Sequence, residues 1–361
     1  MRARPTIRAL VIDDSAYSRQ TITRMLAASP LVEVVATARD GEDALRKTLE
    51  LRPDVVTLDL EMPRMDGFTY LRLVMAQCPT PVIVVSGRGG DADVFKALDL
   101  GATDFIEKPT PHATPELESI RDELIRKVHA TRELRIEKVR ERIASPAPAA
   151  PRRARGTAPG APPVVVVGSS TGGPSALMQI LGAFAEAPPC AIAIAQHMPA
   201  GFTRGFAERL DRLTPFRARE AEGGARLEPG CVFVAPGGRH LEFESVGGRV
   251  VTALRPDLPR DKYAPSADRL FASAAKHFGA DVLAVVLTGM GDDGRAGALA
   301  VKAAGGTVIA ESEATAVIFG MPRQAIEAGA VDRVLPLHEM PAAILSGVRS
   351  VERAQTRKES V

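Results

Sequence analysis

The sequence has little cysteine and no long apolar run, and both shortages exclude whole classes of protein. Its three cysteines, Cys78, Cys190 and Cys231, are far apart and without metal-ligand spacing, so we interpret them as small core residues in a reducing compartment. No apolar run approaches the ~20 residues of a membrane span. Residues 1–5 are basic but lead into a short strand-like run, not into a signal peptide. A cytoplasmic protein is therefore predicted.

The chain also lacks a charge bias and an internal repeat. Its formal net charge is +2, so nothing favours a nucleic-acid partner. With 361 residues, of which 45% are hydrophobic and 25% charged, the chain is long enough for two or three domains with separate cores.

A proline-rich segment, residues 145–163, divides the chain. It has almost no large apolar residues, so it is expected to be an extended linker rather than part of a core. We expect a first domain over residues 1–125, with its last helix continuing to about residue 143. A helical extension and linker over 126–162, a second domain over 163–352 and a polar tail over 353–361 complete the division.

Strand-like and helix-like stretches alternate in the first domain, which predicts a parallel sheet with helices on both faces. The expected strands are 7–12, 32–38, 55–58, 82–85 and 104–106, and the expected helices are 15–28, 43–52, 68–77, 91–100 and 115–143.

The second domain resumes the alternation. Three near-continuous apolar runs, 164–167, 191–195 and 283–287, are typical of strands buried on both faces. Weaker strands are expected at 232–235, 307–310 and 331–335, and a hairpin at 240–246 and 249–254. The fold class is therefore α/β in both parts, a (βα)5 domain followed by a doubly wound, mostly parallel domain.

Polar residues follow the strands of the first domain. Asp13 and Asp14 follow the first strand, Asp59 the third, Ser86 the fourth and Lys108 the fifth. Parallel strands present these ends at one edge of the sheet. Clustered carboxylates suit Mg²⁺, and a lysine and a hydroxyl beside them suit a phosphoryl group. The alternative is that the acids only cap the helices that follow them. Five polar positions at successive strand ends, in the expected order, make this alternative weak.

This set resembles the response-regulator receiver domain, whose phosphorylation segment is similar to Asp59-Leu-Glu-Met-Pro-Arg-Met-Asp-Gly67. The resemblance covers about residues 6 to 125. It implies that a histidine kinase phosphorylates Asp59, that Asp13, Asp14 and Asp59 hold Mg²⁺, and that Ser86 and Lys108 assist. Phe105 takes the place of the family's aromatic switch residue.

In the second domain, a hydroxyl, an imidazole and a carboxylate follow the three apolar strands. Ser170, His197 and Asp293 meet at one sheet edge if these strands are parallel neighbours. An imidazole held by a carboxylate activates a serine hydroxyl as a nucleophile, and helix N-terminal N–H groups stabilise an oxyanion. Taken singly, each residue has a simpler explanation: Ser170 as part of a turn, His197 as a structural histidine and Asp293 as a helix cap.

A rival interpretation comes from the segment 289–294, which is G-x-G-x-x-G after a strand, with Glu311 at the end of the next strand. This pattern alone is weak. Asp292 and Asp293 would repel a pyrophosphate placed there, which argues against a dinucleotide and suits a histidine partner.

Residues 164–350 resemble the catalytic domain of chemotaxis protein-glutamate methylesterases, the CheB family. The similar motifs are Gly168-Ser-Ser-Thr-Gly-Gly173, Gln196-His-Met-Pro199, Leu287-Thr-Gly-Met-Gly-Asp-Asp-Gly294 and the segment 311–322. The resemblance implies that Ser170 is the nucleophile, His197 the base, Asp293 the acid and the Met290 N–H an oxyanion donor, with no cofactor for the esterase reaction. Ser169, Arg269 and Arg295 stand where the family usually has other residues.

The expected function is a phosphorylation-activated serine hydrolase in chemosensory adaptation. It removes methyl esters from glutamate side chains of chemoreceptors and deamidates glutamines, as the family does. The expected partners are a chemotaxis-type histidine kinase and methyl-accepting chemoreceptors, contacted peripherally at the membrane. The alternative function is a response regulator whose second domain only binds a partner.

Overall fold

A computed structural model describes residues 6–87, 91–109, 115–144 and 162–359. The chain forms two compact units, Met1–Ser145 and Pro146–Val361, each described by itself. Most of the predicted linker, residues 145–161, lies outside the described residues. In the part of the chain that is described, no helix combines the length and the hydropathy needed to cross a bilayer.

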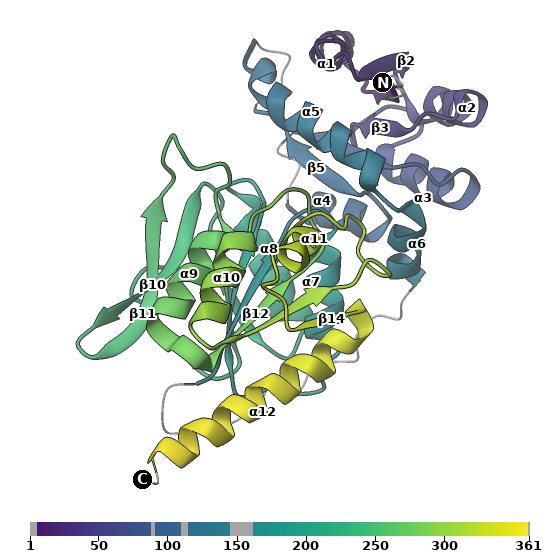
Figure 1. Cartoon of the computed structure of the whole chain (residues 1–361). Helices are drawn as coiled ribbons and strands as arrows, with labels where there is room; N and C mark the ends of the chain where they lie inside the picture. The colour runs from purple at the N-terminus through teal and green to yellow at the C-terminus, as the bar shows by residue number, and fades with distance from the viewer. Residues whose placement is uncertain (1–5, 88–90, 110–114, 145–161, 360–361) are drawn as a thin grey trace. The chain divides into compact units, whose positions relative to one another are not determined.

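The first unit contains a five-stranded parallel sheet with the strand order β2-β1-β3-β4-β5. Figure 1 labels three of its strands, β2, β3 and β5. Its strands lie within one residue of the predicted bounds: β1 (Ile7–Ile12), β2 (Val32–Ala38), β3 (Val55–Leu58), β4 (Val82–Ser86) and β5 (Asp104–Glu107). Strands β1, β3 and β4 are almost fully buried because their runs of valine, isoleucine and leucine pack against helices on both faces, whereas the edge strand β2 is mostly half-buried. The predicted (βα)5 fold is confirmed.

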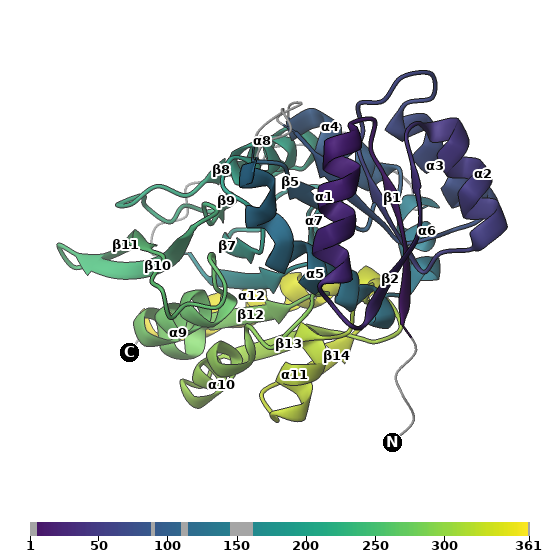
Figure 2. The same cartoon turned by 90° about the horizontal axis from the view of Figure 1, so that it is seen from above.

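Helices cover both faces of this sheet: α1 (Ala16–Ala27) and α5 (Arg121–Ala130) pack on one side, and α2 (Gly41–Leu51), α3 (Gly67–Gln77) and α4 (Asp91–Asp99) lie on the other (Figure 2). Ser15, Asp40 and Asp66 cap α1, α2 and α3, because each side chain accepts the backbone N–H three residues on.

The expectation of one helix over residues 115–143 is wrong. The segment divides into η1 (Pro115–Ile120), α5, η2 (Thr131–Glu133) and α6 (Ile136–Ala144). The buried residues Ile120, Leu124 and Val128 follow the predicted four-residue spacing and pack into the core. The backbone of Leu134 is extended, with φ −77° and ψ 135°, and this interrupts the predicted single helix. The apolar spacing that identified α5 therefore does not predict helix beyond α5.

The second unit contains a seven-stranded parallel sheet with the order β14-β13-β12-β6-β7-β9-β8. Its strands are β6 (Val164–Ser169), β7 (Ala191–Gln196), β8 (Arg217–Glu220), β9 (Cys231–Val234), β12 (Val282–Val286), β13 (Thr307–Glu311) and β14 (Arg333–Leu335). The predicted hairpin forms as β10 (Arg239–Val246) and β11 (Arg249–Pro256). Strand β8 was not predicted, because it is a four-residue edge strand of alternating charge and alanine.

Helices again cover both faces of the sheet, as expected of a doubly wound domain. On one face lie α9 (Ala267–Phe278), α10 (Arg295–Ala303) and α11 (Met321–Glu327), which Figure 2 shows together; on the other lie α7 (Gly173–Gly182), α8 (Phe202–Leu213) and α12 (Met340–Glu359). Two short turns of 3-10 helix, η3 (Gly279–Asp281) and η4 (Leu337–Glu339), precede β12 and α12.

Candidate active site

Three neighbouring strands at the centre of the second sheet end at the same edge. Strand β6 pairs in parallel with β12 on one side and with β7 on the other. The pairing continues beyond the strands, because His197 N donates to Ser169 O at 3.0 Å and Ser170 N donates to Thr288 O at 3.0 Å. The loops that carry Ser170, His197 and Asp293 therefore leave the sheet side by side.

His197 and Asp293 are in direct contact. His197 Nε2 lies 2.7 Å from Asp293 Oδ2, and the side chains are 14% and 2% exposed. Burial of this pair shields the hydrogen bond from water, which strengthens it. Two adjacent acids follow β12, and the family resemblance implied Asp293 as the partner of the imidazole. The structure places Asp293 against the imidazole, while Asp292 is exposed and pairs with Lys262 at 2.6 Å.

Asp293 lies at the N-terminus of α9, where its carboxylate accepts hydrogen bonds that water would otherwise accept. Its Oδ1 accepts Ser266 Oγ at 2.8 Å and Asp268 N at 2.9 Å, and its Oδ2 accepts Ala267 N at 2.6 Å. Burial alone would raise the pKa of Asp293, but the hydrogen bond and charge of His197, together with these backbone N–H groups, hold the pKa below its usual value. Asp293 is therefore a carboxylate at neutral pH.

This carboxylate determines the tautomer of His197. An ionised Asp293 can only accept hydrogen bonds, so the proton of a neutral imidazole lies on Nε2, 2.7 Å away. Nδ1 is then the free base. The nitrogen roles are reversed relative to the chymotrypsin-type arrangement, in which the acid holds Nδ1.

Ser170 lies between the end of β6 and the start of α7. Gly172, which precedes that helix, has φ +77° and no side-chain cap, so the first N–H groups of α7 are not taken by a capping side chain. The fit around Ser170 is close, since a Cβ on Gly289 would lie 2.8 Å from Ser170 Cβ and 2.4 Å from Met321 Sδ. Only glycine allows the two loops to approach so closely.

Gly289, the residue before Met290, is held from two sides. Gly289 N donates to Ile318 O at 3.0 Å, and Gly289 O accepts Met321 N at 2.8 Å at the start of α11. In a trans peptide the next N–H points opposite to that carbonyl. The Met290 N–H is therefore directed away from α11 by a fixed peptide, next to the loop of Ser170.

Ser169, one of the unusual positions, has a structural contact. Its side chain is completely buried and donates to Gln196 Oε1 at 2.7 Å. Gln196 Nε2 in turn donates to the carbonyls of Ser170 and His197, at 2.9 and 3.0 Å. Ser169 thus supports an amide that joins the loops of Ser170 and His197.

The two unusual arginines differ in their surroundings. Arg269 is half-buried and forms ion pairs with Glu242 at 2.7 Å and Asp261 at 3.0 Å. Arg295 begins α10 with an exposed side chain.

In the first unit, the predicted acidic residues gather at the edge of the sheet. Carboxylate oxygens of Asp13, Asp14 and Asp59 lie within 4.8 Å of one another. Lys108 Nζ lies 2.5 Å from Asp59 Oδ2 and 2.8 Å from Asp13 Oδ2. Ser86 and Phe105 are both buried, at the end of β4 and in β5.

The acidic cluster fits a hard divalent cation. Burial is the largest influence on Asp13 and, despite the opposing charge of Lys108, raises its pKa to about 6, with Asp59 adding to the effect. Asp13 Oδ2 is buried and forms no hydrogen bond of good geometry, although the Lys108 ammonium is close. Three clustered carboxylates, two of which also contact Lys108, are a set of hard oxygen donors that suits Mg²⁺.

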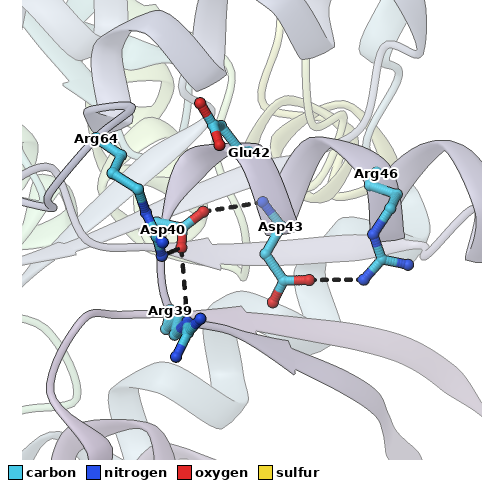
Figure 3. Close-up of a pocket in the computed structure, with 6 residues that line it drawn as sticks. All are labelled: Arg39, Asp40, Glu42, Asp43, Arg46 and Arg64. Carbon is cyan, nitrogen blue, oxygen red and sulfur yellow. Dashed lines mark hydrogen bonds and ion pairs between the residues drawn. The ribbon is translucent and has the colours of Figure 1, made fainter.

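The loop that follows Asp59 is tied to α2. Arg64, with φ +66°, forms an ion pair with Asp40, the cap of α2. Figure 3 shows this pair in an open pocket of about 460 Å³ whose arginines face carboxylates. Asp40 Oδ1 also accepts Asp43 N at 2.9 Å. Through these contacts, arginines and carboxylates of the pocket pair with one another. The same contacts hold the loop that follows Asp59.

Comparison with known proteins shows that the two parts of the chain that hold these sites occur together in one protein family. Residues 165–344 match the family model of CheB methylesterase, and residues 9–118 match that of the response regulator receiver domain. Protein-glutamate methylesterase/protein-glutamine glutaminase 1 of Myxococcus xanthus is 50% identical over 349 residues, 97% of this chain and 99% of that protein. The chain belongs to the CheB methylesterase family.

The family relationship extends to distant organisms and to a solved structure. The protein-glutamate methylesterase/protein-glutamine glutaminase of Pyrococcus abyssi is 39% identical over 96% of this chain and 94% of its own length. The crystal structure of the Thermotoga maritima CheB methylesterase catalytic domain matches with a TM-score of 0.50 and 41% identity, covering 52% of this chain and 99% of that one. The hydrolase names of these relatives favour a catalytic second domain over one that only binds a partner.

The geometry also bears on the dinucleotide interpretation. Glu311 is fully buried, and its Oε2 accepts Thr288 N at 2.9 Å, while Asp293 is held by His197 and α9. Both acids are therefore engaged within this CheB family domain rather than presented to a ribose or a pyrophosphate.

Sequence reasoning missed Tyr263 and Ser266. Ser266 caps α9 and contacts Asp293, a role that a serine before an amphipathic helix could have suggested. The Tyr263 ring stacks on the His197 ring, and no spacing in the sequence signals this contact.

Proposed function

We propose that this chain, a phosphorylation-regulated protein-glutamate methylesterase and protein-glutamine glutaminase of the CheB family, acts through Ser170, His197 and Asp293. The observation that carries the proposal is the buried 2.7 Å contact between His197 Nε2 and Asp293 Oδ2, beside a strand that delivers Ser170 to the same edge.

The reaction begins when Ser170 Oγ attacks the methyl ester carbonyl and its proton passes to His197 Nδ1. The negative oxygen of the tetrahedral intermediate is stabilised by the Met290 N–H. Its collapse breaks the bond to the methoxy group, which leaves as methanol with the proton from His197. Water, deprotonated by His197, then hydrolyses the acyl-enzyme to glutamate. A glutamine substrate follows the same steps and releases ammonia.

Replacing Ser170 with alanine tests the nucleophile. Methanol release from a methyl-esterified receptor fragment should fall by roughly 10³-fold or more. Ser169→Ala is the matched control, because it removes the neighbouring hydroxyl and should lower the rate by less than about tenfold. Activity of Ser170→Ala close to that of the wild type would exclude Ser170, and we expect the wild-type reaction to need no cofactor in the catalytic unit.

In the receiver unit, Asp13, Asp14 and Asp59 are the residues that would hold Mg²⁺, and Asp59 would accept the phosphoryl group. Mg²⁺, when bound, neutralises charge on the transferring phosphoryl oxygens. Lys108 Nζ, 2.5 Å from Asp59, is placed to contact the phosphate. Ser86 and the buried Phe105 are the proposed switch residues that respond to it.

Treatment with a small acyl phosphate tests this assignment. The wild-type chain should gain one phosphoryl group in a Mg²⁺-dependent manner and release methanol faster. Asp59→Asn should do neither and keep its basal rate. Phosphorylation of that variant to the same extent would exclude Asp59 as the site.

The partners and the domain limits complete the proposal. We propose a chemotaxis-type histidine kinase as phosphodonor, the cytoplasmic segments of chemoreceptors as substrate, and no nucleic-acid partner. The working limits of the parts are 1–125, 126–162, 163–352 and 353–361. Limited proteolysis should cut first within 126–162, and a protected linker there would refute this division.

A further inference from the structure

The imidazole of His197 is covered on one face by an aromatic ring. Tyr263 stacks on it with ring centroids 4.5 Å apart and an interplanar angle of 10°. At the edge of the same ring, Nε2 is hydrogen-bonded to Asp293. The stacked ring therefore restrains a motion that the hydrogen bond alone does not, the tilt and rotation of the imidazole about its Cβ–Cγ bond.

The loop that carries Tyr263 is anchored on its N-terminal side by Asp261. Asp261 Oδ2 contacts the buried His240 Nε2 at 3.0 Å and accepts Leu258 N at 3.1 Å and Arg269 at 3.0 Å. Arg269 also pairs with Glu242 of β10. The unusual arginine thus ties the loop to the hairpin and to α9, the helix whose N-terminus holds Asp293.

A second anchor lies directly beside the ring. Lys262 Nζ is 2.6 Å from Asp292 Oδ1 and 5.0 Å from the centroid of the Tyr263 ring. The hydrogen bond with Asp292 is the main cause that raises the pKa of Lys262, and Lys262 in turn lowers the pKa of Asp292, so both groups are charged at neutral pH. It joins the Tyr263 loop to the loop of the catalytic acid.

The hydroxyl end of Tyr263 meets the proposed oxyanion loop. A Cβ placed on Gly291, whose φ is +91°, would lie 2.2 Å from the Tyr263 hydroxyl oxygen. The residue after Met290 must therefore be glycine for the ring to lie flat on His197.

We propose that Tyr263 is a positioning residue that holds the His197 imidazole in the plane required by both Ser170 and Asp293. It acts through His197 and touches no reacting atom. The inference rests on the proposed function, because it presumes that His197 is the base. The flat face of the ring carries this role, not the phenolic hydroxyl, so Tyr263→Phe should preserve it.

Three variants of the full chain separate these contributions. Tyr263→Phe keeps the ring, Tyr263→Leu keeps bulk without a flat face, and Tyr263→Ala removes both. Because a stacked aromatic pair is worth roughly a three- to tenfold change in an equilibrium, kcat for methanol release should fall about three- to tenfold in the Leu and Ala variants. KM should stay within about twofold, and the Phe variant should remain near the wild type.

A second measurement reports on the imidazole without any substrate. In the wild type and in Tyr263→Phe, ¹⁵N NMR of His197 should show one tautomer with the proton on Nε2. In Tyr263→Leu and Tyr263→Ala the two nitrogen shifts should move toward each other as the ring leaves Asp293. If the Ala variant does not fold, the Leu variant decides.

Two results would overturn the inference. A wild-type nitrogen pattern in the Leu variant would mean that stacking does not position His197, even if kcat fell. A Phe variant as slow as the Leu variant would assign the effect to the hydroxyl. Absence of methanol release from the wild type would count against the proposed function, while the ¹⁵N comparison would still decide the role of Tyr263.

Discussion

Replacing Asp293 with asparagine is a sharp test of the catalytic geometry, because the amide keeps the shape of the side chain and changes one acceptor into a donor. The carboxylate accepts from His197 and Ala267 at Oδ2, and from Ser266, Asp268 and Gly294 at Oδ1. Any orientation of the new NH₂ group therefore faces existing donors.

The structure indicates which orientation costs less. An NH₂ in the place of Oδ1 would face the backbone N–H groups of both Asp268 and Gly294, whereas in the place of Oδ2 it would face that of Ala267 alone. The Oδ2 position is therefore favoured. There the amide donates to His197 Nε2, which forces the proton onto Nδ1 and removes the base that Ser170 needs.

The expected losses are large for activity and moderate for stability. A wrong imidazole tautomer lowers kcat by about 10⁴-fold, whereas the unpaired Ala267 N–H costs roughly 1–3 kcal/mol of unfolding free energy. Methanol release measures the first, and urea denaturation of the full chain measures the second. Glu339→Gln, at a carboxylate with a side chain 54% exposed, is the control and should change the unfolding free energy by less than about 0.5 kcal/mol.

A small loss of activity would refute the reasoning. If Asp293→Asn kept more than about a tenth of wild-type kcat, Asp293 would not determine the tautomer of a catalytic His197. A stability loss with intact kcat would leave Asp293 as a cap of α9 only.

Three further predictions follow from other contacts. Ser169→Ala removes the 2.7 Å hydrogen bond to Gln196, which should cost about 1 kcal/mol of unfolding free energy and lower the rate of methanol release by less than about tenfold. A loss of rate as large as that of Ser170→Ala would contradict the assignment of the nucleophile. Gly289→Ala places a Cβ 2.8 Å from Ser170 Cβ and should lower kcat about 10²-fold by displacing the nucleophile. The control Gly223→Ala, with nothing within 4 Å of its Cβ, should not lower kcat, and equal kcat values for the two variants would contradict the close fit. The hydrogen bond and charge of His197 and the backbone N–H groups of α9 outweigh burial and lower the pKa of Asp293, so its contribution to stability is lost as the pH falls through the lower, folded value. The difference in unfolding free energy between wild type and Asp293→Asn should therefore shrink as the pH falls below about 4, and a difference that grows at acid pH would contradict it.

The strands were predictable from sequence to the extent that burial makes them apolar. Strands β6, β7 and β12 are buried along their whole length and consist almost entirely of valine, alanine, isoleucine and leucine, and they were found within one or two residues of their limits. Strand β8 has Arg217 and Arg219 exposed and one buried alanine. Its place in the sheet comes from pairing with β9, which no local pattern records.

The fold class, the order of the two domains and the polar residues that end their strands could be predicted from the sequence, because a parallel sheet places strand ends at a shared edge. The tertiary structure shows the physical difference between the two adjacent acids: Asp293 is buried at the N-terminus of α9, and Asp292 is exposed beside Lys262. It also brought Tyr263 onto His197. Such contacts depend on how loops far apart in the chain pack together, and local sequence patterns carry no information about that packing.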